Sequence, residues 1–455
     1  MLSERQKNFI RSLFPAQDLI EDKCNLMAYS QDSSELFGQP DLVVCPTCIS
    51  QIQKLLQFAY AEQIPIIPRG SGTGRVGGSV PGLEGGIVLS LLKLNKILEI
   101  RAQDFVAVVE PGVITGNLQK VLATQNLFYP PDPASSDYCT LGGNVATNAG
   151  GMQALKYGVT ANYVLGLEVV LANGELLDLK NYCHKNATGL NLSQLFVGSE
   201  GILGIITKIY LKLLPLPESS GTLLAGFSSL DELNQGLSRF WQSNLFPCAL
   251  ELIDHNALKA ISQINALPWN KENEIKVLLL IKFDGSESSV CEQLQESQNT
   301  LKPFFHLTKT GAEQDKLWEI RKKISPAALK LKPAKISEDF TLPRSRLGEF
   351  LLFGQELSAR YLPILIFGHL GDGNLHVNIL YDPKDKIERL KAKEVHTRLL
   401  DKTLELQGTI SGEHGIGKKK KKYLSKQLSP KVLAVSKQLK LTLDPKNILN
   451  PGKAI

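Results

Sequence analysis

Hydrophobic and polar residues follow two different spacings along the first half of the chain. Short apolar runs at residues 41–44, 64–67, 87–90 and 105–110 have the length and the β-branched content of buried strands. Helical spacing predicts a helix at about 115–125, and an earlier helix whose apolar face carries Ile49, Ile52, Leu55, Leu56 and Ala59. Strands and helices therefore alternate, with glycine-rich turns between them.

A domain boundary is expected at about residue 217. An apolar strand-like segment ends there in Pro215 and Pro217, and the glycine clusters of the first half stop. In the second half, helical spacing predicts helices at residues 230–241, 318–329, 392–407 and 430–441. An apolar run predicts a strand at residues 276–283. This order predicts an α+β domain.

The composition is that of an ordinary globular protein. Of 455 residues, 43% are hydrophobic and 21% are charged, which fits two or three domains. The formal net charge is +6, and a run of five lysines at residues 418–422 supplies nearly all of it, so no broad nucleic-acid-binding surface is expected. The longest aliphatic stretches, such as residues 277–281, are far shorter than the roughly 20 residues of a membrane span.

The N-terminus and the cysteines favour a cytoplasmic protein. Residues 1–13 mix acids and bases and lack the apolar core of a signal peptide. Cys45 and Cys48 have the spacing of a redox or zinc-binding pair, but no second pair completes a zinc site, so we interpret the spacing as chance.

The segment at residues 68–78, PRGSGTGRVGG, contains a literal GxGxxG at Gly72, Gly74 and Gly77. A dinucleotide-binding fingerprint requires a helix directly after it, and Pro81 and Gly82 prevent one. The Rossmann interpretation therefore fails. The alternative is a loop of small residues whose backbone N–H groups close around an anion.

Two further segments share this character, at residues 130–151 and 197–207. Glycine and alanine let a flat ligand approach the backbone, because little or no side chain stands in the way. Three separate glycine-lined segments predict a large, extended cofactor.

These three segments resemble the flavin-binding domain of the vanillyl-alcohol oxidase (PCMH) type. From about residue 36 to residue 455 the chain is similar to the branch that contains glycolate oxidase flavoprotein subunits, D-lactate dehydrogenases and D-2-hydroxyglutarate dehydrogenases. The resemblance implies an α+β protein with an N-terminal helical segment (1–35), a PCMH-type FAD-binding domain (36–217), a substrate or cap domain (218–407) and a C-terminal segment that returns to the flavin (408–455).

The resemblance also implies FAD and the residues that hold it. Some relatives attach the flavin covalently through His or Cys; this glycine loop has neither, so non-covalent FAD is expected, with Cys139 as the open exception. The implied contacts lie in the three glycine segments and the closing motif: Pro68, Arg69, Gly70, Ser71, Gly72, Thr73, Gly74, Pro131, Asp132, Thr140, Gly142, Gly143, Asn144, Thr147, Asn148, Gly201, Ile202, Ile206 and Asn450.

Two histidines flank a predicted hairpin in the second half. Asp372-Gly373 lies between apolar flanks, and a two-residue turn there would pair His369 with His376, with Cβ atoms about 5 Å apart. Such a pair can bind one metal ion, or can be two hydrogen-bonded core residues. Asn378 would project from the same face as His376.

A third metal ligand is expected to be a carboxylate, as in open catalytic sites. Glu413 and His414 lie in the glycine-rich segment 408–417. The resemblance implies that His369, His376 and Glu413 bind a divalent metal and that His414 is the catalytic base. Zinc suits this ligand set, and manganese or iron would also fit.

The segment around Arg321 resembles the carboxylate-binding stretch of the family. The resemblance implies that Arg321 grips the substrate carboxylate in a bidentate manner and that Ser325 and Asn378 also contact the substrate. D-2-hydroxyglutarate enzymes tend to have lysine where this chain has Ser337, which argues against a second substrate carboxylate.

The expected activity is the oxidation of D-lactate or glycolate to the 2-oxo acid, by hydride transfer to flavin N5 with metal assistance. D-2-hydroxyglutarate dehydrogenase and a non-catalytic flavin subunit of a multi-subunit glycolate oxidase are the alternatives. The electron acceptor is open among a quinone, an electron-transfer protein and an iron-sulfur subunit, and a homodimer is also open. The lysine run is expected to be a solvated helix start or a contact with the inner face of the membrane.

Overall fold

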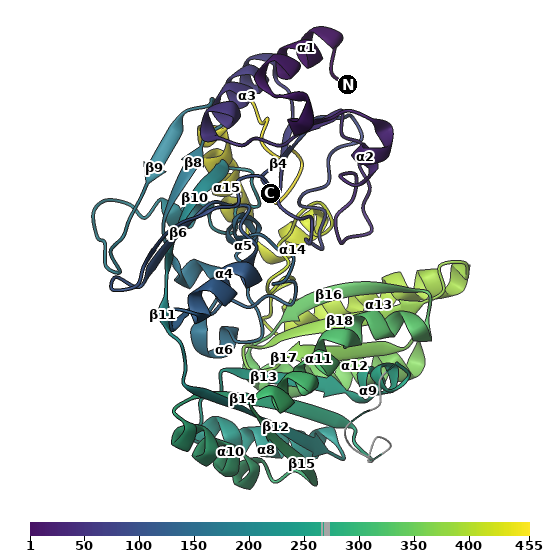
Figure 1. The fold of residues 1–455 in the computed structure, drawn as a ribbon. Coiled ribbons are helices and arrows are strands. Elements are labelled where there is room, and N and C mark those ends of the chain that lie inside the picture. The colour runs from purple at the N-terminus through teal and green to yellow at the C-terminus, as the bar shows by residue number, and fades with distance from the viewer. Residues whose placement is uncertain (265–266, 268–273) are drawn as a thin grey trace. The chain divides into compact units, whose positions relative to one another are not determined.

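The computed structural model describes residues 1–264, 267 and 274–455, which form two compact units (Figure 1). The first unit comprises Met1–Gly150, Gly158–Leu216 and Glu413–Ile455, and the second comprises Gly151–Tyr157 and Pro217–Gly412. Residues 1–35, expected as a separate segment, thus group with the first unit, and the return to that unit begins at Glu413. In the part of the chain that the structure describes, no helix combines the length and the apolar character needed to cross a membrane.

The first unit contains a four-stranded sheet in the order β1-β2-β4-β3. Its strands are β1 (Leu19–Ile20), β2 (Leu42–Val44), β4 (Ile87–Ser90) and β3 (Ile66–Arg69). The β2-β4 and β4-β3 pairs are parallel, and helix α3 (Ile49–Glu62) connects β2 to β3. Its buried residues Ile52, Leu55, Leu56 and Ala59 pack in the same core as Ile10 and Phe14. This packing is why the N-terminal helix α1 (Glu4–Leu13) belongs to the first unit.

A second, five-stranded antiparallel sheet has the order β5-β6-β10-β8-β9. Its strands are β5 (Ile97–Arg101), β6 (Val106–Val109), β10 (Ile205–Lys212), β8 (Val164–Val170) and β9 (Leu176–Leu179). The pair β7 (Leu127–Phe128) and β11 (Leu214–Pro215) is separate. The other helices of this unit are α2 (Lys23–Met27), α4 (Thr115–Ala123), α5 (Leu141–Thr147), α7 (Ser193–Phe196), α14 (Leu424–Gln427) and α15 (Pro430–Leu443).

The second unit is built on a seven-stranded antiparallel sheet in the order β15-β12-β14-β13-β17-β18-β16. Its strands are β15 (Phe305–Thr310), β12 (Ser219–Phe227), β14 (Val277–Gly285), β13 (Ala249–Asp254), β17 (Ile364–His369), β18 (Asn374–Tyr381) and β16 (Ala334–Thr341). Its helices are α6 (Ala154–Tyr157), α8 (Leu230–Gln242), α9 (His255–Ser262), α10 (Glu287–Leu301), α11 (Ala312–Leu331), α12 (Leu347–Arg360) and α13 (Lys386–Glu405).

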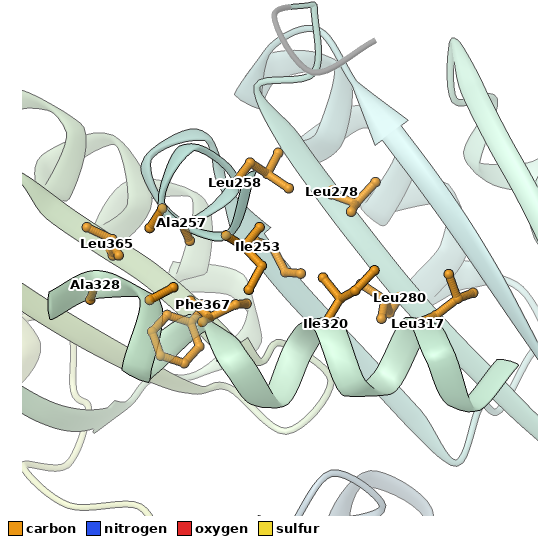
Figure 2. Close-up of a cluster of buried hydrophobic side chains, with 14 of the residues drawn as sticks. Ile253, Ala257, Leu258, Leu278, Leu280, Leu317, Ile320, Ala328, Leu365 and Phe367 are labelled. Carbon is orange, nitrogen blue, oxygen red and sulfur yellow. The ribbon is translucent and has the colours of Figure 1, made fainter. Parts of the chain in front are cut away.

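Helix α11 covers one face of this sheet together with α9. Figure 2 shows Leu317 and Ile320 of α11 beside Leu280 of β14, and Ala328 of α11 near Phe367 of β17; Ile253 of β13 belongs to the same buried cluster. Because side chains alternate along a strand, residues 251 and 369 lie on this same face, two positions away from Ile253 and Phe367. Because the apolar core holds α11 on this face of the sheet, α11 also covers the polar residues 251 and 369.

The hairpin between β17 and β18 has a different register from the predicted one. His369 pairs with Asn374, and Phe367 pairs with His376. The connecting loop is residues 370–373, closed by hydrogen bonds from Gly373 N to the carbonyl oxygens of His369 and Leu370. The predicted pairing of His369 with His376 is therefore wrong by two residues. An even shift leaves every side chain on its face, so the two histidines still lie together.

The lysine run is not uniformly solvated, contrary to one of its two interpretations. Lys418 is exposed but Lys420 is only 3% exposed, and a short 3₁₀ turn, Lys421–Tyr423, follows. The backbone N–H groups of Lys418 and Lys419 both donate to the carbonyl oxygen of Val76. These bonds hold the start of the run against the glycine loop and bury part of it.

Candidate functional site

The glycine loop after β3 offers a row of free backbone donors. From residue 71 to residue 78, no backbone N–H donates a hydrogen bond to any residue that the structure describes. Most of these residues are buried or half-buried, and Arg75 is the exposed exception. Buried N–H groups rarely lack a partner in folded proteins, so a ligand with several acceptor oxygens fits here. The pyrophosphate of a dinucleotide cofactor has this chemistry.

The three glycine segments meet in the first unit. A Cβ on Gly70 would lie 2.2 Å from Oγ1 of Thr140, and a Cβ on Gly201 would lie 2.4 Å from Cγ of Pro68. Gly201 also has φ +72°, which disfavours any other residue. In contrast, a Cβ on Gly74 would meet only one atom, 3.7 Å away. Glycine is therefore required where the segments touch, while open space remains beside the loop.

Several polar side chains expected at the cofactor instead form bonds within the first unit. Arg69 is 7% exposed, and its guanidinium donates to Ser79 and to the carbonyl oxygen of Ala28. The amide of Asn144 donates to Thr115 Oγ1 at 2.7 Å. The amide of Asn450 donates to the carbonyl oxygens of Gly78 and Glu200 at 2.8 and 2.7 Å. These side chains shape the segments that surround the open space.

Glu200 is a residue of this region that the sequence motifs did not single out. Its two carboxylate oxygens accept hydrogen bonds from the backbone N–H groups of Ile416 and Gly417 at 2.8 and 2.7 Å. Burial raises the pKa of this carboxyl, against the lowering effect of these two bonds. Glu200 thus ties the third glycine segment to the loop that follows His414.

The second unit presents a linked group of polar side chains under α11. His369 Nδ1 is hydrogen-bonded to Oε1 of Glu251, and Arg321 Nε donates to Oε2 of Glu251 at 2.5 Å. Glu251 is fully buried, while His369 and Arg321 are each 6% exposed. Burial alone would raise the pKa of Glu251, but the charges of Arg321 and His369 lower it to about 2. Glu251 is therefore an anion beneath the helix.

Arg321 keeps most of its hydrogen-bonding capacity. A guanidinium has five N–H donors, and among the described residues Arg321 uses only Nε. Its guanidinium carbon lies 4.8 Å from the ring centre of Phe367. Four buried N–H donors therefore face no acceptor of the second unit, and a planar carboxylate is the acceptor that fits such a fork best.

Asn378 is also buried without a partner. It is 0% exposed, and neither Oδ1 nor Nδ2 has a hydrogen-bond partner within the described chain. It lies on β18 two residues beyond His376, on the face that carries Phe367 and His369. A buried amide left unpaired is costly, so a polar ligand group is expected beside it. Ser325, one helical turn after Arg321, accepts a hydrogen bond from Lys335 Nζ at 2.7 Å.

Two of the three proposed metal ligands lie close together in the second unit. The ring centres of His369 and His376 are 5.2 Å apart. Glu413 follows Gly412 directly in the chain, and Gly412 N donates to Asp339 Oδ2 at 2.9 Å. His414 Nε2 lies 3.6 Å from Oε1 of Glu413. Two imidazoles and a carboxylate are a donor set suited to a divalent ion.

Two family models match the chain. The model for the C-terminal domain of FAD-linked oxidases covers residues 216–454, and a model for an FAD-binding domain covers residues 40–180. The chain belongs to the FAD-linked oxidase family. The resemblance found in the glycine and histidine motifs is thereby confirmed, as is the FAD cofactor.

Relatives in this FAD-linked oxidase family extend over nearly the whole chain. A glycolate oxidase subunit GlcD from Bacillus subtilis is 37% identical over 100% of this chain and 97% of its own length. A D-lactate dehydrogenase from Anaerostipes hadrus is 34% identical, with 97% and 95% coverage. A D-2-hydroxyglutarate dehydrogenase from Stutzerimonas stutzeri is 33% identical, with 98% and 97% coverage.

Solved structures show the same fold at low identity, which confirms the predicted fold class. p-Cresol methylhydroxylase superposes with a TM-score of 0.80 at 17% identity, covering 100% of this chain and 97% of that one. The 4-ethylphenol oxidase of Gulosibacter chungangensis gives 0.79 at 19% identity, covering 100% and 98%.

Glu251 is a residue of the polar group under α11 that the sequence analysis missed. One signal was available, since Glu251 is a lone acid between Leu250 and Leu252 in a strand that is otherwise apolar up to Asp254. A carboxylate at a core position requires a partner. The sequence does not show which partner, because Arg321 and His369 are 70 and 118 residues away.

Proposed function

We propose that this protein oxidises a small D-2-hydroxy acid, D-lactate or glycolate, to the 2-oxo acid. The observation that carries the proposal is the buried guanidinium of Arg321, which offers four unused N–H donors, together with the unpaired amide of Asn378 on the sheet face that α11 covers. A 2-hydroxy acid supplies a carboxylate that Arg321 can bind. Its hydroxyl oxygen or a carboxyl oxygen can pair with the amide of Asn378.

The residues divide the chemistry among them. Arg321 holds and orients the carboxylate, and Asn378 pairs with a substrate oxygen. His414 accepts the hydroxyl proton, a role for which imidazole is the side chain used most often in enzymes. His369, His376 and Glu413 would hold a divalent metal, zinc most readily, which would lower the cost of ionising the hydroxyl. FAD, when bound, would supply the acceptor for the hydride that leaves C2.

One observation favours D-2-hydroxyglutarate as a second candidate substrate. Lys335 donates through Nζ to both oxygen atoms of Ser325, so a second cation contacts α11 at a residue one helical turn after Arg321. Ser337 lies two residues further along β16, on the same face. Lys335 could therefore bind the second carboxylate of this substrate, which Ser337, with no positive charge, cannot bind.

We further propose that reduced flavin passes its electrons to a separate acceptor that meets a basic surface. Residues 414–443 contain nine lysines and no acid, and seven of these lysines are at least partly exposed. On α15, Val432, Val435 and Leu439 are 41–48% exposed. Basic and apolar side chains together suit an anionic membrane surface, which would place the protein near quinone, or an acidic partner protein.

Anaerobic mixing tests the proposed activity. The purified protein should have a visible flavin spectrum that bleaches when D-lactate or glycolate is added, and L-lactate is the control. Bleaching by D-2-hydroxyglutarate alone would select the second candidate. Protein that stays fully oxidised with all these acids would refute the proposal. Protein that stays colourless after incubation with FAD would refute it as well.

A further inference from the structure

We infer that Glu251 is a positioning residue. It fixes the orientation of both Arg321, the proposed substrate anchor, and His369, a proposed metal ligand, so that carboxylate binding and metal binding are coupled. The inference rests on the proposed function and adds a residue that no motif indicated. It is carried by one carboxylate that bonds Arg321 through one oxygen and His369 through the other.

The bond to His369 determines which ring nitrogen would coordinate an ion. Nδ1 is hydrogen-bonded to Glu251, so an ion would bind through Nε2. A carboxylate in this position also makes the imidazole a stronger ligand and fixes the plane of its ring. The strand pairing enforces this arrangement, because Glu251 of β13 is directly opposite His369 of β17.

The bond to Arg321 determines which edge of the guanidinium is free. With Nε held by Glu251 and the guanidinium plane near the ring of Phe367, the two terminal nitrogens remain for a ligand. Phe367 in turn packs near His376, with ring centres 5.4 Å apart. Contacts among described residues of the second unit thus connect Arg321 to His369 through Glu251, and to His376 through Phe367.

The alternative is that Glu251 only neutralises a buried arginine. In that case its loss would destabilise the fold and weaken substrate binding, while metal affinity would not change. The shared role instead requires that one substitution alters both binding steps. It also requires that the effect is absent at another buried Glu–His pair.

The test is Glu251→Gln in the FAD-loaded protein, with metal affinity measured by equilibrium dialysis of zinc or manganese and elemental analysis. We expect metal binding to weaken by roughly 10- to 100-fold, the usual effect of losing such a partner. The D-lactate concentration that half-saturates flavin reduction should rise in the metal-loaded protein. FAD content and the oxidised flavin spectrum should not change.

Glu338→Gln is the matched control. Glu338 is 3% exposed and contacts His396 Nε2 at 3.2 Å, but residue 338 lies on the opposite face of β16 from residues 337 and 339. Metal affinity should be unchanged in this variant. If Glu251→Gln folds poorly, Glu251→Asp keeps the charge but shortens the side chain, so it cannot hold both partners and should weaken metal binding as well.

Metal affinity that is unchanged in both Glu251 variants would overturn the inference, whatever happens to substrate binding. An equal loss in Glu338→Gln would overturn it too, because the effect would then be general destabilisation. Dialysis needs no turnover. The metal result therefore stands even if no hydroxy acid reduces the flavin, and that failure would count against the proposed function alone.

Discussion

Replacing Arg321 by lysine tests the substrate anchor most directly. The change keeps a positive charge opposite Glu251, so the buried carboxylate is not left unpaired. It removes the planar fork, because one ammonium group must then serve both Glu251 and the substrate. We expect a folded, flavin-containing protein that binds its substrate weakly.

The structure sets the size of this effect. Nε of Arg321 is already bonded to Glu251, so the substrate carboxylate can take two parallel bonds from the terminal nitrogens. Losing one charge-assisted bond costs about 1.5–3 kcal/mol. This corresponds to a roughly 10- to 150-fold rise in the half-saturating concentration of D-lactate. Arg321→Met should behave differently, since a buried acid without its partner costs about 3–5 kcal/mol of stability.

Stopped-flow reduction of the flavin over a range of D-lactate concentrations gives the saturation constant. Thermal unfolding of the same samples separates binding from stability. The matched control is Arg346→Lys, because Arg346 forms a surface ion pair with Glu349, at 3.5 Å, and its side chain is 53% exposed. Saturation in Arg321→Lys that equals the wild type would remove Arg321 from the site and with it the main support for a carboxylate substrate.

Four further outcomes are expected. His414→Ala should retain FAD and slow flavin reduction by about 10²–10⁴-fold, and near-normal rates would place the base elsewhere. Removal of the metal, or His376→Ala, should abolish turnover and leave the flavin spectrum intact. If elemental analysis finds no stoichiometric metal in fully active protein, the histidines are core residues and not metal ligands. Gly201→Ala should lower the melting temperature and the FAD affinity more than Gly189→Ala. Both glycines have positive φ, but of these two only Gly201 is crowded, by Pro68. Equal losses in the two variants would show that the contact with Pro68 is unimportant. Burial lowers the pKa of Lys453 to about 7, so between that pH and the ordinary lysine pKa of 10.5 the unfolded chain binds a proton that the folded chain lacks. The free energy of unfolding should therefore rise with pH across this window, and urea titrations at about pH 7.5 and 9.5 should show a smaller rise in Lys453→Met.

Local patterns predicted the individual elements well. Residues 87–90 were expected as a strand and form β4, and the helix expected at 230–241 is α8, Leu230–Gln242. The absence of a helix after the glycine loop was also predicted, because Pro81 and Gly82 act within a few residues of the loop. Such features depend on backbone preferences of neighbouring residues, which a single sequence displays.

The hairpin marks the limit of this reasoning. Asp372-Gly373 indicated a turn, but the four-residue loop moved the register by two. The shared face of His369 and His376 survived the error because side chains alternate with a period of two.

The sequence by itself determined the family and the FAD cofactor, and it predicted residues for the expected chemistry, since all of these rest on motifs within short segments. Only the tertiary structure decided that Glu251 joins Arg321 to His369. Those three residues meet because β13 pairs with β17 and because α11 packs its apolar face on both strands. Pairing and packing of this kind depend on contacts between distant parts of the chain, so no local pattern encodes them.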